Sequence, residues 1–198
     1  KPAPKRRRTP SYVKNLRGVR NWKEAREWLQ WRSIEDVEAM TPDLAGVPRG
    51  KMMPSVKFTT ETSLALPNAV FRQTITGDYP EETDEFQHDP LDSDLKLMPD
   101  LSTLSVVPWE TDPTAQVICD IVSTSGKPIL YTPRNLLRHV MGLYDAKGWK
   151  AVVAPEIEFY LVAQNIDPDY PLQTPKGRSG RSVSGGQGYS IAGINEFD

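Results

Sequence analysis

Two carboxylates, Glu156 and Glu158, stand two positions apart inside an apolar run that extends from Ala151 to Ala163. On an extended strand the side chains alternate, so both carboxylates project from one face, while Ile157 and Phe159 project from the other. Burying an unpaired carboxylate costs several kcal/mol, so two of them on one face predict a bound cation or a set of donors. Carboxylate oxygens are the ligands that Mg²⁺ and Mn²⁺ prefer, and the pair could bind one ion or divide between two.

The same spacing has a simpler explanation, which the motif alone leaves open. Antiparallel sheets often solvate one face, so the two glutamates could belong to an edge strand whose polar face lies in water. The elements around the pair therefore decide how much weight the metal hypothesis deserves.

Local patterns predict three of these elements. A helix is predicted to begin after Asn21, a residue typical of N-caps, because Trp22, Ala25, Trp28 and Leu29 recur at helical spacing. A hairpin is predicted from a strand over Val37–Asp43, a turn at Leu44-Ala45-Gly46 and a return strand from Arg49. An amphipathic helix is predicted over Pro133–Gly148, with its apolar side packed on the following strand.

The octapeptide Ala154–Leu161, with its Pro-Glu-x-Glu-Phe pattern, resembles a strand of the glutamine synthetase family, and four other segments agree in the family's order. They are Ile34–Pro54; Leu97–Thr103 with Val107-Pro108-Trp109 and Thr114–Asp120; the expected helix Pro133–Gly148, which starts with Pro-Arg; and Ser184–Tyr189, with its Gly-rich approach to a tyrosine. The resemblance implies an α+β protein, with an N-terminal β-grasp domain followed by the first part of a glutamine synthetase catalytic domain (α/β, with an antiparallel sheet). The expected divisions are a basic tail over 1–20, a helix and β-grasp domain over 21–131, and the start of a truncated catalytic domain over 132–198.

The resemblance also implies a reaction and its participants. Family members use ATP to phosphorylate the γ-carboxylate of glutamate, and an amine then displaces phosphate from γ-glutamyl phosphate. Two divalent ions, Mg²⁺ or Mn²⁺, assist, and Glu156 and Glu158 would each supply a ligand to one of them. The family assembles as dodecamers of two stacked hexameric rings, so a homo-oligomer is expected. Because each site forms between subunits, this N-terminal fragment alone is expected to be inactive.

A loop at Ile75-Thr76-Gly77-Asp78-Tyr79 bears on which amine is used. In the family the corresponding loop reaches a neighbouring subunit's site, and Asp78 matches the aspartate that helps bind ammonium; Tyr189 matches a tyrosine near the same pocket. The family's Asp-Gly-Ser-Ser pattern is absent here. The loop is more similar to the γ-glutamylpolyamine synthetase branch, typified by γ-glutamylputrescine synthetase, which favours putrescine or another polyamine over ammonia. The alternatives are a glutamine synthetase that uses ammonia and a non-catalytic assembly protein.

Composition limits the remaining possibilities. The 198 residues carry a net charge of −2 and a single cysteine, Cys119, which excludes an internal disulfide and is expected to be a small core residue. No apolar stretch is long enough to cross a membrane, which suggests a cytoplasmic protein. The basic run Lys5-Arg6-Arg7-Arg8 could bind nucleic acid, but short basic tails are commonly just solvated, so nucleic-acid binding is not expected as the main function. No role is predicted for His88 or His139.

Overall fold

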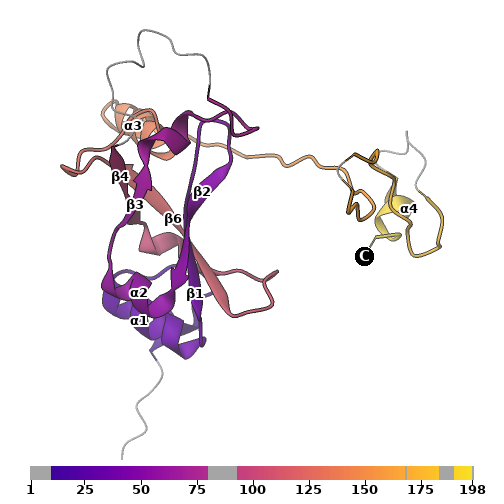
Figure 1. Cartoon of the computed structure of the whole chain (residues 1–198), viewed down its shortest axis with the longest axis horizontal. Coiled ribbons are helices and arrows are strands. Elements are labelled where there is room, and N and C mark those ends of the chain that lie inside the picture. Colours follow the sequence, from indigo (N-terminus) through magenta and orange to yellow (C-terminus); the bar gives the residue numbers. More distant parts are fainter. Residues whose placement is uncertain (1–9, 80–92, 168, 183–189, 198) are drawn as a thin grey trace, which may run out of the picture. The chain divides into compact units, whose positions relative to one another are not determined.

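A six-stranded mixed sheet forms the centre of residues 10–151 (Figure 1). The computed structural model describes residues 10–79, 93–167, 169–182 and 190–197, and the chain divides into two compact units, 1–151 and 152–198. The sequence analysis placed the domain boundary at residue 132, and that boundary stays a prediction. The basic run at 5–8, residues 80–92 and the Gly-rich segment 184–189 lie outside the described residues.

The strand order of the sheet is β2-β1-β6-β4-β3. The short strand β5 pairs with the first half of β6, whereas β4 pairs with the second half. Strands β1 and β6 are parallel, and every other pair is antiparallel. Together with the helices this makes an α+β fold, as expected. The strands are β1 (Asp36–Pro42), β2 (Pro48–Pro54), β3 (Leu64–Pro67), β4 (Asp94–Pro99), β5 (Ser105–Val106) and β6 (Thr114–Val122).

Helix α1 (Trp22–Trp31) confirms the predicted N-terminal helix. The Asn21 side chain accepts a hydrogen bond from the Glu24 amide at 3.0 Å, which satisfies one of the free donors of the first turn. Ala25, Trp28 and Leu29 are buried, so the helical spacing read from the sequence marks the face that packs on the sheet. The Trp28 indole also donates to the Asn15 carbonyl at 2.9 Å.

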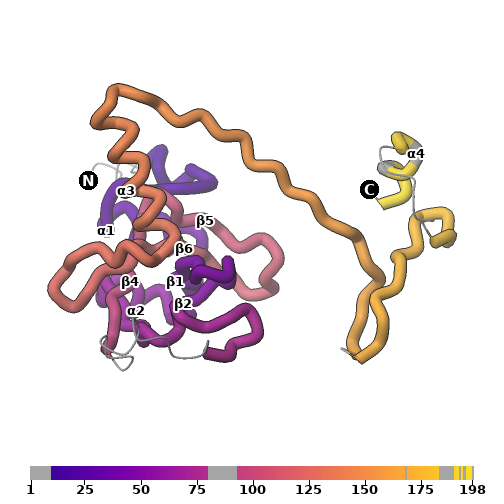
Figure 2. The backbone as a smooth tube through the Cα atoms, turned by 90° about the horizontal axis from the view of Figure 1, so that it is seen from above, coloured from indigo at the N-terminus to yellow at the C-terminus, as the bar shows by residue number. Residues whose placement is uncertain are grey.

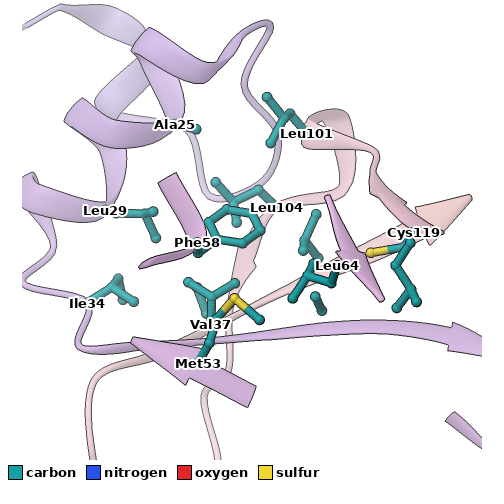
Figure 3. Packing of buried hydrophobic residues seen from close by; sticks show 14 of the residues in the cluster. Ala25, Leu29, Ile34, Val37, Met53, Phe58, Leu64, Leu101, Leu104 and Cys119 are labelled. Carbon is teal, nitrogen blue, oxygen red and sulfur yellow. The ribbon is translucent and has the colours of Figure 1, made fainter. Parts of the chain in front are cut away.

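The core lies between the sheet and the helices α1 and α2 (Ser55–Thr60) (Figure 3). Alternate residues of β1 and β6 face inward, including Val37, Ala39 and Val117. Phe58 of α2 is completely buried, and its ring lies 5.2 Å from that of Trp22. Cys119 is buried in β6, as expected, and burial, with the nearby Asp120 charge, raises the pKa of its thiol to about 12.

The predicted hairpin is confirmed, and a buried aspartate stabilises its turn. The carboxylate of Asp43 is inaccessible to solvent and accepts from the amides of Ala45 and Val47, each at 2.9 Å, and from Arg49 Nε at 2.8 Å. Gly46 has a φ of +82°, a conformation that glycine adopts without strain. Burial alone would raise the pKa of Asp43, but the hydrogen bonds from Arg49 and from the turn amides outweigh it and hold the pKa below its usual value.

We expect the Asp43→Asn substitution to lower the free energy of unfolding by about 1.5–3 kcal/mol at neutral pH, because a charge-assisted bond and an acceptor are lost. Folding lowers the pKa of the Asp43 carboxyl group. The ionised carboxylate therefore contributes its full stabilisation above the unfolded pKa of about 3.9, and this stabilisation is lost as the pH falls through the pKa of the folded state. Urea denaturation of both proteins at pH 7 and pH 3 measures this. The difference in stability should shrink in acid, and an unchanged difference would show that ionisation of Asp43 is irrelevant.

Helix α3 (Pro133–Asp145) forms where predicted, with Pro133 in its first turn, but its apolar side is not covered. Leu136, Leu137 and Leu143 are 47%, 62% and 53% exposed. The helix contacts β1 and β6 instead through the side that carries Asn135, which is buried and donates to the Ile121 carbonyl at 2.5 Å. The strand on which this face was expected to pack does not form among the described residues after α3. Within the described residues, no helix combines the length and the hydropathy needed to cross a bilayer.

Candidate functional site

The segment that carries Glu156 and Glu158 is extended but is not a strand. Residues 151–161 have no regular secondary structure, and no described segment pairs with them (Figure 2). Ile157 and Phe159, predicted to face a core, are 85% and 74% exposed, and both glutamates are exposed as well. The predicted strand with one buried face is therefore absent here. A lone strand leaves its backbone groups and its apolar face without partners, and the second unit supplies no neighbouring strand among its described residues.

The two glutamates fit a divalent cation in chemistry, but they do not complete a site. Their four carboxylate oxygens are hard ligands of the kind that Mg²⁺ and Mn²⁺ select. Such ions take about six ligands, and no group of three or more His, Cys, Asp or Glu side chains gathers within the described part of the chain. The assignment of Glu156 and Glu158 as metal ligands therefore stays a prediction, and further ligands would have to join them.

Asp78 closes a tight turn at the tip of a loop. The Thr74 amide donates to the Asp78 carbonyl at 2.8 Å, and Gly77, with a φ of +88°, donates to the Thr74 carbonyl at 3.0 Å. The Thr76 hydroxyl donates to Asp78 Oδ2 at 2.8 Å. Asp78 and its neighbours Ile75 and Tyr79 are exposed, so this turn offers a carboxylate, an alkyl side chain and an aromatic side chain to solvent.

The predicted site residues belong to different parts of the chain. Asp78 belongs to the first unit and the two glutamates to the second, while Tyr189 lies outside the described residues. His139 is exposed on α3, and no role is assigned to it; His88 lies outside the described residues. The roles of Asp78 and Tyr189 stay predictions.

A cluster of two arginines and two aspartates, which the sequence analysis missed, joins α3 to the sheet. Arg134 bonds Asp100 and, at 2.6 Å, Asp120; Arg138 reaches the same two carboxylates at 3.0 and 3.1 Å. Arg134 and Arg138 are one helical turn apart, and that spacing could have revealed a shared partner. Asp100 stands before the short helix η4 (Leu101–Thr103), and Asp120 lies on β6.

Arg134, Asp100 and Asp120 of this arginine–aspartate cluster are partly shielded from water, while Arg138 is exposed, and the four opposite charges compensate one another. Burial would raise the pKa of Asp100, but hydrogen bonds from Ser102 and the charges of Arg134 and Arg138 outweigh it and hold that pKa below its usual range. The cluster fixes the start of α3, the helix that leads to the segment with the two glutamates.

The comparisons with known proteins agree with the resemblance seen in the sequence. Residues 130–198 match the family model described as the glutamine synthetase catalytic domain. A glutamate–isopropylamine ligase from a Pseudomonas species is 33% identical over 146 residues, which cover 72% of this chain and 32% of that protein. Gamma-glutamylputrescine synthetase PuuA from Escherichia coli is 30% identical over 185 residues, which cover 91% of this chain and 39% of that protein.

A cryo-EM structure of Plasmodium falciparum glutamine synthetase shares the fold. The TM-score is 0.50 at 16% identity, and the match covers 66% of this chain and 24% of that chain. This chain thus spans about a third of the length of the curated relatives it matches.

The mixed sheet of the first unit and the match over residues 130–198 together define an α+β protein that contains part of a glutamine synthetase catalytic domain. The chain belongs to the glutamine synthetase family.

Proposed function

We propose that the natural protein containing this chain is an ATP-dependent ligase that joins an amine larger than ammonia to the γ-carboxylate of glutamate. The observation that carries the proposal is the similarity over 72% and 91% of the chain to two relatives named for an alkylamine and a diamine. The turn at Ile75–Tyr79 supports it, because Asp78 presents a carboxylate suited to an ammonium group and the same turn exposes two side chains that can contact an alkyl chain.

The proposed reaction has two steps. An oxygen of the glutamate γ-carboxylate attacks the γ-phosphorus of ATP, the bond to the bridging oxygen breaks, and ADP leaves. The amine nitrogen then attacks the acyl carbon of γ-glutamyl phosphate; phosphate leaves and the nitrogen loses a proton to give the amide. A divalent cation would neutralise charge on the phosphoryl group, and Glu156 and Glu158 are the residues of this chain proposed to hold it. Asp78 would bind the amine in its ammonium form, which gives one proton to solvent to become the neutral nucleophile before the attack, and Tyr189 would help to orient it.

We propose that the sheet of the first unit is the family's N-terminal β-grasp domain and that subunits assemble in rings, in which sites form between neighbours. The exposed apolar sides of α3 and of residues 151–161 support this, since a folded protein rarely leaves such surfaces uncovered.

The test is ADP release by the full-length natural protein with glutamate and Mg²⁺, offered ammonia, isopropylamine, putrescine or spermidine separately. We expect kcat/KM for at least one alkylamine to exceed that for ammonia by more than about tenfold, since buried methylene groups each contribute about 0.8 kcal/mol. Preference for ammonia would instead identify a glutamine synthetase, and turnover with none of the four would favour a non-catalytic assembly protein.

A further inference from the structure

Three lysines from three different elements line one cavity of about 400 Å³ in the first unit. Lys51 lies on β2, Lys57 on α2 and Lys96 on β4. Much of the remaining wall is formed by Met53, by Ser63, which precedes β3, and by Leu64 and Ala65 at the start of β3. Strands β2 and β3 stand at the two ends of the strand order, and the cavity opens where α2 connects them. We call it the lysine cavity.

Among the described residues, the charges that line the lysine cavity are not balanced. Glu61 is the carboxylate in this described lining, and its Oε2 lies 3.9 Å from Lys57 Nζ, with both side chains more than half exposed. Lys96 is half-buried and donates to the Thr124 carbonyl at 3.0 Å, a neutral acceptor that leaves its charge in place. The Lys51 side chain makes neither a hydrogen bond nor an ion pair with the described residues. In the described lining, three lysine charges are thus opposed by one carboxylate, and a dianion would balance them more fully.

The floor of the lysine cavity is apolar. Met53 and Leu64 are each only 6% exposed and belong to the core (Figure 3). A volume of about 400 Å³ lies at the lower end of the range for small-molecule sites and exceeds what an inorganic anion fills. Lysine ammonium groups bind phosphate as point charges, while the floor suits a hydrocarbon or aromatic part.

We propose that the lysine cavity binds a small organic phosphate, with its dianionic group among Lys51, Lys57 and Lys96 and its apolar part against Met53 and Leu64. The described lining contains neither Asp78 nor the two glutamates, and a cavity lined by lysines suits neither the amine nor the metal of the proposed reaction.

Isothermal titration calorimetry of this chain tests the proposal, with phenyl phosphate and inorganic phosphate as probes and sodium chloride at matched ionic strength as the blank. Phenyl phosphate should bind more tightly than inorganic phosphate. The triple variant Lys51→Gln, Lys57→Gln, Lys96→Gln should weaken binding by at least about tenfold, because each lost charge removes part of the attraction. A control variant, Lys14→Gln, Lys23→Gln, Lys127→Gln, has the same net charge and should bind as the parent does.

Two single variants keep the test decisive if the triple variant does not fold. Lys51→Gln alters an exposed side chain and should weaken binding about threefold, whereas Glu61→Gln removes the opposing carboxylate and should strengthen binding by a similar factor. Absence of heat with both probes, equal losses in the lysine and control variants, or weaker binding by Glu61→Gln would each overturn the proposal.

Discussion

Replacing both Glu156 and Glu158 by glutamine in the full-length natural protein is expected to lower the rate of ADP formation by about a hundredfold or more. Glutamine keeps the size and one oxygen of each side chain but removes the negative charge that attracts a divalent ion. Metal stabilisation of charge at a transferring phosphoryl group contributes several kcal/mol, and each 1.36 kcal/mol is a factor of ten in rate. The measurement is steady-state ADP release at saturating ATP, glutamate and the preferred amine.

Glu110→Gln is the matched control, because Glu110 is an exposed carboxylate of the first unit with no part in the proposed site. Its rate should equal that of the parent. If the double variant is slow because it has lost metal ligands, it should also bind Mn²⁺ more weakly. Electron paramagnetic resonance measures this affinity. Full activity and unchanged Mn²⁺ affinity would mean that the two glutamates lie on a solvated surface, which is the simpler explanation of their spacing.

The Trp28→Ala substitution should have the largest effect on stability, lowering the free energy of unfolding of the first unit by about 3–5 kcal/mol. Trp28 is completely buried, donates to the Asn15 carbonyl, and supports the Arg32 guanidinium 4.1 Å above its ring. Its removal would leave a large cavity in the core beside α1 and remove one of the two hydrogen bonds to the Asn15 carbonyl, which also accepts from Arg32 Nη2 at 2.7 Å. Urea denaturation followed by circular dichroism measures the change.

Trp31, three residues along the same helix, provides the matched comparison. It is 53% exposed, so Trp31→Ala should cost less than about 1 kcal/mol, chiefly its contact with Arg32. If Trp28→Ala does not fold, Trp28→Phe still tests the assignment, because it retains an aromatic ring but loses the bond to Asn15, at a cost of about 1 kcal/mol or more. Equal losses for Trp28→Ala and Trp31→Ala would contradict the packing described for α1.

The elements that could be predicted from sequence are those whose determinants are local. The N-cap at Asn21 and the spacing of Ala25 and Trp28 lie within one helix, and the positive φ of Gly46 belongs to one turn. In each case the residues that determine the local structure lie within that helix or turn, so the local sequence pattern was sufficient to predict it.

The failures involve partners distant in sequence or outside the described residues. A strand over 151–163 needs neighbouring strands, and the apolar face of α3 needs a surface to cover it; neither partner is found among the described residues. The arginine–aspartate cluster joins Arg134 to Asp100, which are 34 positions apart, and spacing within the helix could suggest a shared partner but not identify it. The lysine cavity likewise depends on how β2, α2 and β4 come together.

For the candidate site, the sequence supplied residue types and a family, while the structure tests only local geometry. The Ile75–Tyr79 segment forms a turn that presents Asp78 to solvent, in agreement with a loop that contacts a ligand. The arrangement of Glu156 and Glu158 around an ion is not defined by local geometry, because it depends on further ligands that would have to join them.

The single cysteine of this chain makes it well suited to spectroscopic labelling. Cys119 is buried in β6, and with a pKa of about 12 its thiol remains protonated and unreactive at neutral pH. A cysteine introduced at an exposed position, such as Phe159→Cys beside the two glutamates, would therefore accept a fluorophore or a nitroxide selectively without removal of the native thiol. Such a probe would report directly on when and how the segment with Glu156 and Glu158 becomes ordered as metal, nucleotide or a second subunit is added.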